Sequence, residues 1–365
     1  MTDAPPVPDA ARDLAALPKG HLHLHLEGAM RPETLAELAQ RHGREVPPTR
    51  GYGSFLAFVD LYVAACAVLR TTEDLQRLTR EVVQDAARDG AVWVEPSIYP
   101  VHHVGTIGPV EEVTAAVVTA GQEAAREYGI GFGLMLAANR TADPAEAERI
   151  ARVAAGWAGR GVVSFGLADN EDGYPPEPFV EAFRIARDAG LLAAPHAGEL
   201  AGPESVAAAL TLLGADRVQH GVRAVEDPEL VRRLADAGTC LDVCPTSNLL
   251  LSVVPSLAEH PLPRLLAAGV RCSVNADDPL LFGPGLLAEY ELCRDELGLD
   301  DRALAAVARS SIESSGADPA TRRSALADID AWERQPATRT AGPTGAAAGG
   351  PTAGPVPAGD RRSQP

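Results

Sequence analysis

The chain has 365 residues, of which 46% are hydrophobic and 22% charged, and 50 acidic against 32 basic side chains give it a formal net charge of −18. This acidic balance argues against a nucleic-acid partner, because a protein that binds phosphate backbones needs a basic face, and it favours a small-molecule or protein partner. No apolar run approaches the roughly 18 residues of a membrane helix, and the first 20 residues lack the apolar core of a signal peptide. We therefore expect no membrane association and a cytoplasmic location, while the oligomeric state stays open.

The two ends of the chain differ in composition from the part between them. Residues 1–12 are rich in Pro, Ala and Asp, and residues 336–365 form a Gly/Pro/Ala-rich tail with almost nothing to bury. Such segments cannot bury enough apolar surface to fold, so we expect both to be disordered. No similar linker interrupts residues 13–335, which we predict to form one domain.

Inside residues 13–335, short apolar runs alternate with longer segments of helical periodicity. This alternation predicts parallel strands with right-handed crossovers, and eight strands is the number that closes a (β/α)8 TIM barrel of the α/β class. A doubly wound open sheet is the alternative, but no G-x-G-x-x-G follows an early strand. Residues 71–90 are typical of the predicted helices, with Thr72 as a plausible N-cap and Gly90 beyond the end. The predicted strands are 21–26, 91–95, 130–137, 162–168, 191–196, 217–220, 240–244 and 270–276.

Cysteine and lysine usage narrows the possible chemistry. The five cysteines contain no C-x-x-C pair, so neither a thiolate zinc site nor a redox dithiol is indicated. We expect free, mostly buried thiols in a reducing compartment. Lys19 is the only lysine in the chain, which leaves essentially no candidate for a P-loop or Schiff-base lysine.

Unusual polar residues fall where the predicted strands end, and in a barrel of this kind chemistry gathers at the carboxyl ends of the strands. Five of the nine histidines lie within or at the ends of predicted strands, and four others, at positions 42, 102, 103 and 260, receive no chemical role. The strand-end polar residues, in chain order, are His23, His25, Glu27, His196, Glu199, His220, Asn275, Asp277 and Asp278.

The first predicted strand reads HLHLHL. Strand alternation places His21, His23 and His25 on one face, the barrel interior, at spacings of about 6.6 Å. The two nearest the carboxyl end, His23 and His25, can share a metal there, while His21 is expected deeper, as an interior residue or one that supports a ligand without binding the metal itself. A metal-free cluster of buried histidines is the alternative.

Imidazole and carboxylate ligands suit zinc. Three histidines and one aspartate with an open position for water would make a catalytic site, where zinc lowers the pKa of bound water toward neutrality. Binuclear hydrolases of this architecture use a carboxylated lysine on the fourth strand, which this chain lacks, so we expect one Zn²⁺ per chain. The expected ligands are His23, His25, His196 and Asp277.

Several motifs together identify a family. The segments HLHLEGAMRPETL, PHAGELAGPES, RVQHGVRAVEDPEL, LDVCPTSNLLLSVV with HPLPRLLAAG, and VNADDPLLFG resemble, in order and spacing, the adenosine deaminase family of the amidohydrolase superfamily. The resemblance covers about residues 15 to 320. It implies attack of hydroxide on C6 of an adenine ring, a tetrahedral intermediate and loss of ammonia.

The resemblance also implies residue roles. Glu199 of PHAGE would donate a proton to purine N1, His220 of QHG would orient and help deprotonate the attacking water, and Asp278 would contact purine N7. The expected catalytic residues are thus Glu199, His220 and Asp277, and the expected substrate contacts are His25, Glu27, Phe55, Leu56, Asp169, Glu199 and Asp278.

Physical chemistry is consistent with these roles. A general acid at Glu199 must be protonated near pH 7, which requires an apolar pocket that raises its pKa. The adjacent carboxylates of Asp277 and Asp278 repel each other unless a metal neutralises the charge of Asp277 and a shared proton that of Asp278. Taken alone, Glu199 could be a solvated loop carboxylate, and the two aspartates a helix cap with an acidic first turn.

Departures from the family pattern concern the substrate. Glu27 stands where most adenosine deaminases carry an aspartate that binds the ribose 5′-hydroxyl, and a glutamate is more similar to the adenine deaminase and aminodeoxyfutalosine deaminase branches. Asp169 replaces a common glycine whose backbone N–H meets purine N3. Phe55 and Leu56 resemble a lid over the base, although ordinary helix packing is the alternative.

The sequence therefore predicts a zinc-dependent aminohydrolase. Its expected substrate is a purine nucleoside, adenosine or 2′-deoxyadenosine first, giving inosine or 2′-deoxyinosine and ammonia. A 5′-modified adenine nucleoside or free adenine comes second. A cytosine- or guanine-type deaminase and a non-catalytic binding protein on a retained scaffold are the remaining hypotheses.

Overall fold

The computed structural model describes residues 11–336 of the chain. Asp13–Gln335 pack as one compact unit. The two segments predicted to be disordered, 1–12 and 336–365, lie almost entirely outside the described residues.

The strands of this unit form a closed parallel ring, which confirms the predicted (β/α)8 barrel. Every strand pair is parallel, and three of the eight barrel positions are occupied by a strand in two pieces. The strands, with the two-piece positions joined by "with", are β1 (Lys19–His21), β2 (Ala91–Val94) with β3 (Ser97–Ile98), β4 (Gly131–Phe132) with β5 (Leu134–Asn139), β6 (Val162–Ala168), β7 (Leu192–Ala193) with β8 (His196–Ala197), β9 (Arg217–His220), β10 (Cys240–Val243) and β11 (Arg271–Val274).

The ring closes between the first strand region and the last. Leu24 and Asp277 form a parallel bridge, flanked by bonds from the His25 N–H to the Asp277 carbonyl (2.9 Å) and from the Asp277 N–H to the His23 carbonyl (3.1 Å). The barrel closure therefore runs through the candidate metal ligands themselves.

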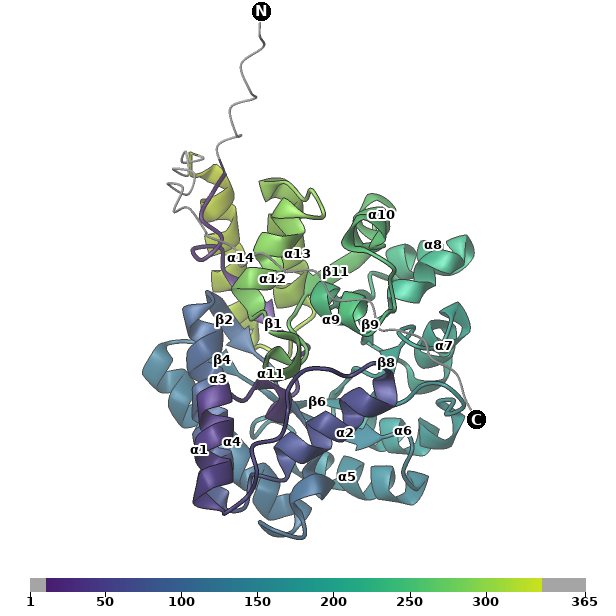
Figure 1. The fold of residues 1–365 in the computed structure, drawn as a ribbon. Helices are drawn as coiled ribbons and strands as arrows, with labels where there is room; N and C mark the ends of the chain where they lie inside the picture. The colour runs from purple at the N-terminus through teal and green to yellow at the C-terminus, as the bar shows by residue number, and fades with distance from the viewer. Residues whose placement is uncertain (1–10, 337–365) are drawn as a thin grey trace, which may run out of the picture. The chain divides into compact units, whose positions relative to one another are not determined.

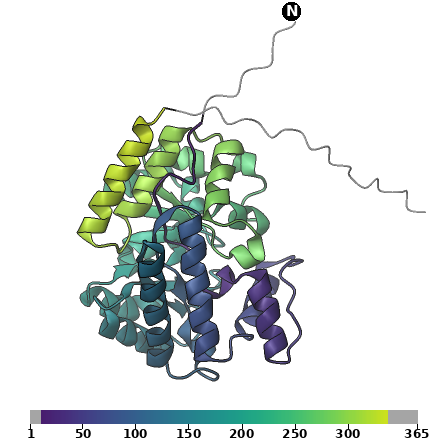
Figure 2. The same cartoon turned by 90° about the vertical axis from the view of Figure 1, so that its left-hand side faces the viewer.

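Helices surround the strands (Figure 1). The long helices α3 and α4 pack side by side, as both views show (Figures 1 and 2). The helices are α1 (Pro32–Arg41), α2 (Phe55–Cys66), α3 (Thr72–Arg88), α4 (Val110–Tyr128), α5 (Pro144–Trp157), α6 (Val180–Asp188), α7 (Pro203–Ala208), α8 (Pro228–Ala237), α9 (Pro245–Leu250), α10 (Leu262–Ala267), α11 (Pro279–Phe282), α12 (Leu286–Asp295), α13 (Asp301–Glu313) and α14 (Pro319–Arg334). None of the helices in the described part of the chain combines the length and apolar character needed to cross a membrane.

Helix α3 shows why these segments become helices. Its N-cap is Thr71, one residue before the predicted Thr72, because Thr71 and Asp74 form a reciprocal capping box that satisfies two backbone N–H groups. Gly90 follows the C-cap with φ +81°, a conformation that favours glycine. The predicted helix was thus correct and its cap was displaced by one residue.

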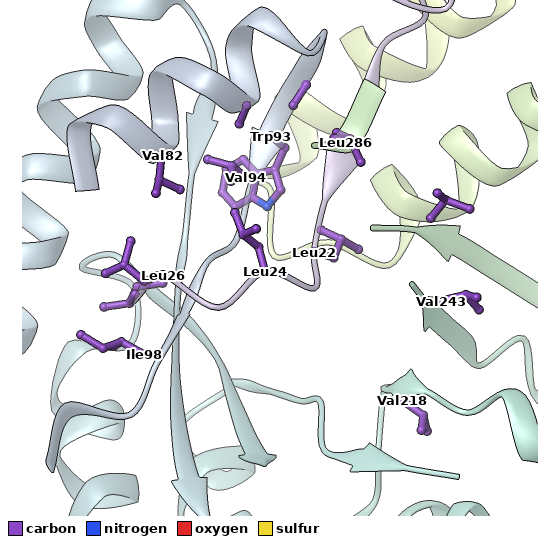
Figure 3. Packing of buried hydrophobic residues seen from close by; sticks show 14 of the residues in the cluster. Leu22, Leu24, Leu26, Val82, Trp93, Val94, Ile98, Val218, Val243 and Leu286 are labelled. Atoms are coloured by element: carbon purple, nitrogen blue, oxygen red, sulfur yellow. The ribbon is translucent and has the colours of Figure 1, made fainter. Parts of the chain in front are cut away.

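The HLHLHL segment departs from the prediction. β1 ends at His21, because the N–H groups of Leu22 and His23 both donate to Asn275 Oδ1 (2.7 and 3.1 Å) rather than to a neighbouring strand. Regular alternation stops there. In Figure 3 the segment continues past Leu22, Leu24 and Leu26 among buried apolar side chains.

His21 is buried, as predicted, but strand alternation predicted the wrong face for its ring. His21 is paired with Val94 in the register of β1 and β2, and its ring lines a cavity together with Val82 of α3 and Leu286 of α12. Its Nε2 accepts the N–H of Ala276 at 3.2 Å. The ring thus lies between the strand and the helices, because the irregular backbone at Leu22–His23 separates its orientation from that of the next histidine.

Below the candidate site, a charged group fills the barrel. Arg217 is fully buried, with Nη2 2.6 Å from Glu95 Oε2 and Nε 2.9 Å from Asp242 Oδ2. Asp242 also accepts the hydroxyl of Ser273 (2.7 Å), and its backbone carbonyl lies 3.0 Å from His23 Nδ1. This group therefore supports the first histidine of the site.

We predict that Arg217→Met strongly destabilises the fold. The substitution leaves two buried carboxylates without a cation, which costs about 3–5 kcal/mol of the free energy of unfolding. Urea denaturation measures this loss. The control is Arg232→Met on α8, whose partners Glu229 and Asp236 are exposed and whose loss should change stability little. Equal effects of the two substitutions would contradict the argument.

Candidate metal and substrate site

Three imidazoles and one carboxylate converge at the carboxyl ends of the strands. Asp277 Oδ1 lies 3.2 Å from His23 Nε2 and 3.2 Å from His25 Nε2, and His23 Nε2 lies 3.2 Å from His196 Nε2. His23 and His25 follow β1, His196 begins β8, and Asp277 follows β11. Residues far apart in the sequence thus come together: His23, His196 and Asp277, with His220, offer ligand atoms within 4.8 Å of one another, and His25 forms a second such group with Asp277 and Asp278.

The outer nitrogens of these histidines determine where their protons lie. Nδ1 of His23 faces the Asp242 carbonyl at 3.0 Å, and Nδ1 of His196 faces the Leu167 carbonyl at 3.1 Å. A carbonyl only accepts, so both Nδ1 atoms carry hydrogen. His25 Nδ1 lies 3.1 Å from the hydroxyl of Ser97, which itself donates to the Leu24 carbonyl.

The Nε2 atoms of His23 and His196 are therefore lone pairs that face each other at 3.2 Å, and the Nε2 atoms of His23 and His25 both face the Asp277 carboxylate. These lone pairs have no hydrogen-bond donor between them. Metal-ligating histidines are oriented in this way, by hydrogen bonds from their outer nitrogens. The residues fit a divalent cation.

Glu199 is held beside this group by a second glutamate. The carboxylate of Glu171 accepts the N–H groups of Gly198 (2.9 Å), Glu199 (2.8 Å) and Leu200 (2.8 Å), and the hydroxyl of Ser205 (2.6 Å). These bonds fix the loop that follows β8. Glu171 was not among the predicted site residues, although it lies only three residues after the end of the predicted strand 162–168.

Burial controls the protonation of Glu199. Its side chain is only 5% exposed. Burial first, and then the charges of Asp277 and Glu171, raise its pKa well above the ordinary value for a glutamate. A carboxyl with this environment can remain protonated near neutral pH and serve as a proton donor.

His220 completes the group from the end of β9. Its Nε2 lies 3.4 Å from Glu199 Oε1 and 3.7 Å from Asp277 Oδ2. Among residues 11–336, four non-glycine residues have positive φ, and three of them are Asp169 (+81°), His220 (+63°) and Asp277 (+59°). Backbone strain of this kind concentrates at functional sites.

Asp278 is buried and its side chain makes no cap bond to α11, which removes the helix-cap alternative for it. Its Oδ1 finds no hydrogen-bond partner within the described chain. Burial raises its pKa, and the adjacent charge of Asp277 adds to that rise, against the opposing effect of His25. A side chain at Gly28 would meet Asp278 Oδ1 at 1.7 Å, so only glycine fits beside this carboxyl.

A pocket opens above these residues. It is lined by His25, Glu199, His220, Asp277 and Asp278 on one side, and by apolar side chains of α2 on the other. Phe55 lies in this lining, whereas the Leu56 side chain is 63% exposed and does not line the pocket. The α2 residues in the lining are Phe55, Phe58, Val59, Tyr62 and Val63.

Glu27 lies outside the pocket lining. It is fully buried, and its two oxygens are occupied, Oε1 by His103 Nε2 (2.7 Å) and Oε2 by the Tyr62 hydroxyl (2.9 Å). His102, the neighbour of His103, lines the pocket. Neither histidine was predicted to have a role, because both lie outside the predicted strands.

Asp169 does line the pocket. Its Oδ2 accepts the Asn139 amide at 2.6 Å and its Oδ1 accepts the Asn170 N–H at 2.6 Å. Its positive φ explains why glycine suits this position in the family that the chain resembles. Here the two hydrogen bonds of the Asp169 carboxylate hold the backbone in this conformation.

Comparisons with known proteins agree with this arrangement. The adenosine deaminase family matches residues 18–332. A Streptomyces coelicolor protein provisionally named adenosine/adenine deaminase is 44% identical over 339 residues, covering 89% of this chain and 99% of its own length.

Two solved structures share the fold. The crystal structure of adenine deaminase from Arthrobacter aurescens is 32% identical with a TM-score of 0.82, covering 87% of this chain and 99% of its own. An amidohydrolase from Burkholderia ambifaria with bound Zn is 32% identical with a TM-score of 0.81, covering 88% of this chain and 92% of its own. The chain belongs to the adenosine deaminase family and is a hydrolase that deaminates an adenine-type substrate.

Proposed function

We propose that this chain is a zinc-dependent adenine deaminase, which converts free adenine and water into hypoxanthine and ammonia. The observation that carries the proposal is the environment of Glu27. Where related enzymes with an aspartate would bind a ribose 5′-hydroxyl, the Glu27 carboxylate is already occupied by His103 and Tyr62 and does not line the pocket. No carboxylate at this position remains to receive a sugar.

This proposal reverses the order of substrates expected from the sequence, where adenosine came first. The apolar side chains of α2 and the ring of His102 border the pocket near Glu27, and they suit a flat purine better than a polyhydroxylated ribose. The Arthrobacter structure is that of an adenine deaminase. The Streptomyces relative carries both substrates in its name, so adenosine remains the second candidate.

The proposed Zn²⁺ ligands are His23, His25, His196 and Asp277, one ion per chain. The Burkholderia relative was solved with bound Zn, which supports the choice of metal. When bound, zinc would lower the pKa of water and supply a nucleophile at neutral pH.

The remaining roles belong to side chains around the pocket. Glu199, protonated because it is buried, would give its proton to purine N1 as C6 accepts oxygen, which keeps charge from building on the ring. Asp278 would meet N7, and His220 would orient the attacking water. The C6–O bond forms, the C6–N bond breaks, and the amine leaves as ammonia. Of the two water protons, one would pass by way of the Asp277 carboxylate to the leaving amine, and the other would restore the proton that Glu199 gave to N1.

A substrate panel tests the proposal. We expect purified zinc-loaded protein to release ammonia from adenine with a kcat/KM at least about tenfold above that for adenosine or 2′-deoxyadenosine, since a pocket without a sugar acceptor leaves ribose hydroxyls unpaired. The adenine-to-hypoxanthine absorbance change measures it. A higher kcat/KM for adenosine would overturn the choice of base over nucleoside, and ammonia from none of them would overturn the proposed function. Guanine and cytosine serve as negative controls.

A further inference from the structure

A buried hydrogen-bond chain runs from His220 away from the pocket. His220 Nδ1 lies 3.2 Å from Asn248 Nδ2, and Asn248 Oδ1 lies 3.2 Å from His260 Nε2. His260 Nδ1 accepts the backbone N–H of Leu262 at 3.1 Å. His220, Asn248 and His260 are 1%, 0% and 3% exposed. Water therefore cannot easily replace any link.

The backbone N–H of Leu262 determines which atom donates in every hydrogen bond of this series. An amide N–H only donates, so His260 Nδ1 must be a lone pair and the single ring proton of His260 must lie on Nε2. Burial lowers the pKa of His260 to about 4, which keeps the ring neutral. His260 Nε2–H thus donates to Asn248 Oδ1.

The amide of Asn248 carries this order of donors and acceptors on to His220. With Oδ1 facing His260, the NH₂ group faces His220 and donates to its Nδ1. His220 Nδ1 is then a lone pair, and the ring proton lies on Nε2, which faces Glu199 and Asp277. In His23 and His196, whose Nδ1 atoms face carbonyls, the proton lies on the opposite nitrogen.

We propose that Asn248 and His260 are positioning residues that hold His220 as a hydrogen-bond donor toward the pocket. His220 is then neither a metal ligand nor the resting acceptor of the water proton, although its Nε2 lies within ligand distance of the metal group. The donated hydrogen bond is directed at the oxygen that adds to the ring, where it stabilises developing negative charge. This role differs from that of proton acceptor, which the family resemblance implied for His220.

The kinetic consequence rests on the proposed deaminase function, but the proton position does not. Nitrogen-15 NMR of histidine-labelled protein distinguishes the two neutral tautomers directly. The chain has nine histidines, and the spectrum of His220→Gln assigns the signals of His220 by their loss. We expect the Nε2–H pattern for His220. An Nδ1–H pattern in the unmodified protein would overturn the proposal without any variant.

Asn248→Asp is the decisive substitution. A carboxylate of the same shape can only accept, so it should draw the His220 proton to Nδ1 and invert the tautomer. We expect kcat to fall about 100-fold, the cost of one lost donor to a developing charge, with KM nearly unchanged. An unchanged tautomer, or an unchanged kcat with an inverted tautomer, would contradict the proposal.

A matched pair at His260 guards against misfolding of that variant. His260→Gln keeps an N–H donor for Asn248 Oδ1 and should retain the Nε2–H pattern and most of the rate. His260→Leu removes the donor and should lose both, while His42→Gln on the capped end of α1 serves as a control. If the Gln and Leu variants behave alike, His260 acts only by packing and its hydrogen bond to Asn248 does not set the tautomer of His220. If the spectra are as expected but the protein deaminates none of the substrates, the proposed function is wrong and the position of the His220 proton still stands.

Discussion

Glu199→Gln is expected to lower kcat by about 10²–10⁴-fold while zinc content and adenine binding remain. Glutamine has the same shape and can still donate a hydrogen bond to N1, but it cannot transfer a proton as the ring takes up charge. The loss therefore falls on the transition state rather than on the bound substrate. Steady-state kinetics and metal analysis separate the two effects.

The pH dependence of the unmodified protein follows from the same carboxyl. Because burial raises the pKa of Glu199, the protonated, active form persists to higher pH than for an exposed glutamate, and kcat should decline as pH rises through the raised pKa. Glu199→Gln should lack this alkaline decline. Glu204→Gln, an exposed neighbour at the start of α7, is the control and should keep both the rate and the pH profile. A Glu199 variant with wild-type kcat would remove this residue from the proton-donor role.

His23→Ala is expected to lose zinc and, with it, all measurable deamination. Mutation of residues that merely orient a ligand costs about 10–100-fold in metal affinity, so loss of a ligand should cost more. His23 is also the ligand in contact with both His196 and Asp277, and its removal takes away the centre of the group. Mass-spectrometric metal analysis after dialysis measures the zinc per chain.

The control for His23→Ala is His42→Ala, which removes a histidine bonded to Asp74 and should leave the zinc content unchanged. Asp277→Asn tests the carboxylate in the same assay and should also lose metal. Retention of one zinc ion by His23→Ala would mean that the ion is held elsewhere.

The residues that carry the proposed chemistry were accessible from the sequence because they lie at the ends of recognisable strands. His196, His220 and Asp277 each begin, end or follow a strand predicted from its apolar run. Side-chain alternation and the order of strands and helices along the chain can be read from the sequence, so they place such residues at one end of a barrel without any knowledge of tertiary contacts. The same reasoning failed for His21, because the backbone at Leu22–His23 leaves the ladder to bond Asn275, a residue 253 and 252 positions away.

What the sequence alone determined is therefore the barrel, the family and the set of polar residues at its carboxyl end. Only the tertiary structure decided what each of them contacts. The occupation of Glu27 by Tyr62 and His103, the loop held by Glu171, and the chain from Leu262 to His220 all depend on side chains brought together by folding. Periodicity follows from neighbours along the chain, whereas the position of a proton on an imidazole depends on which atom, from a distant segment, lies opposite each nitrogen.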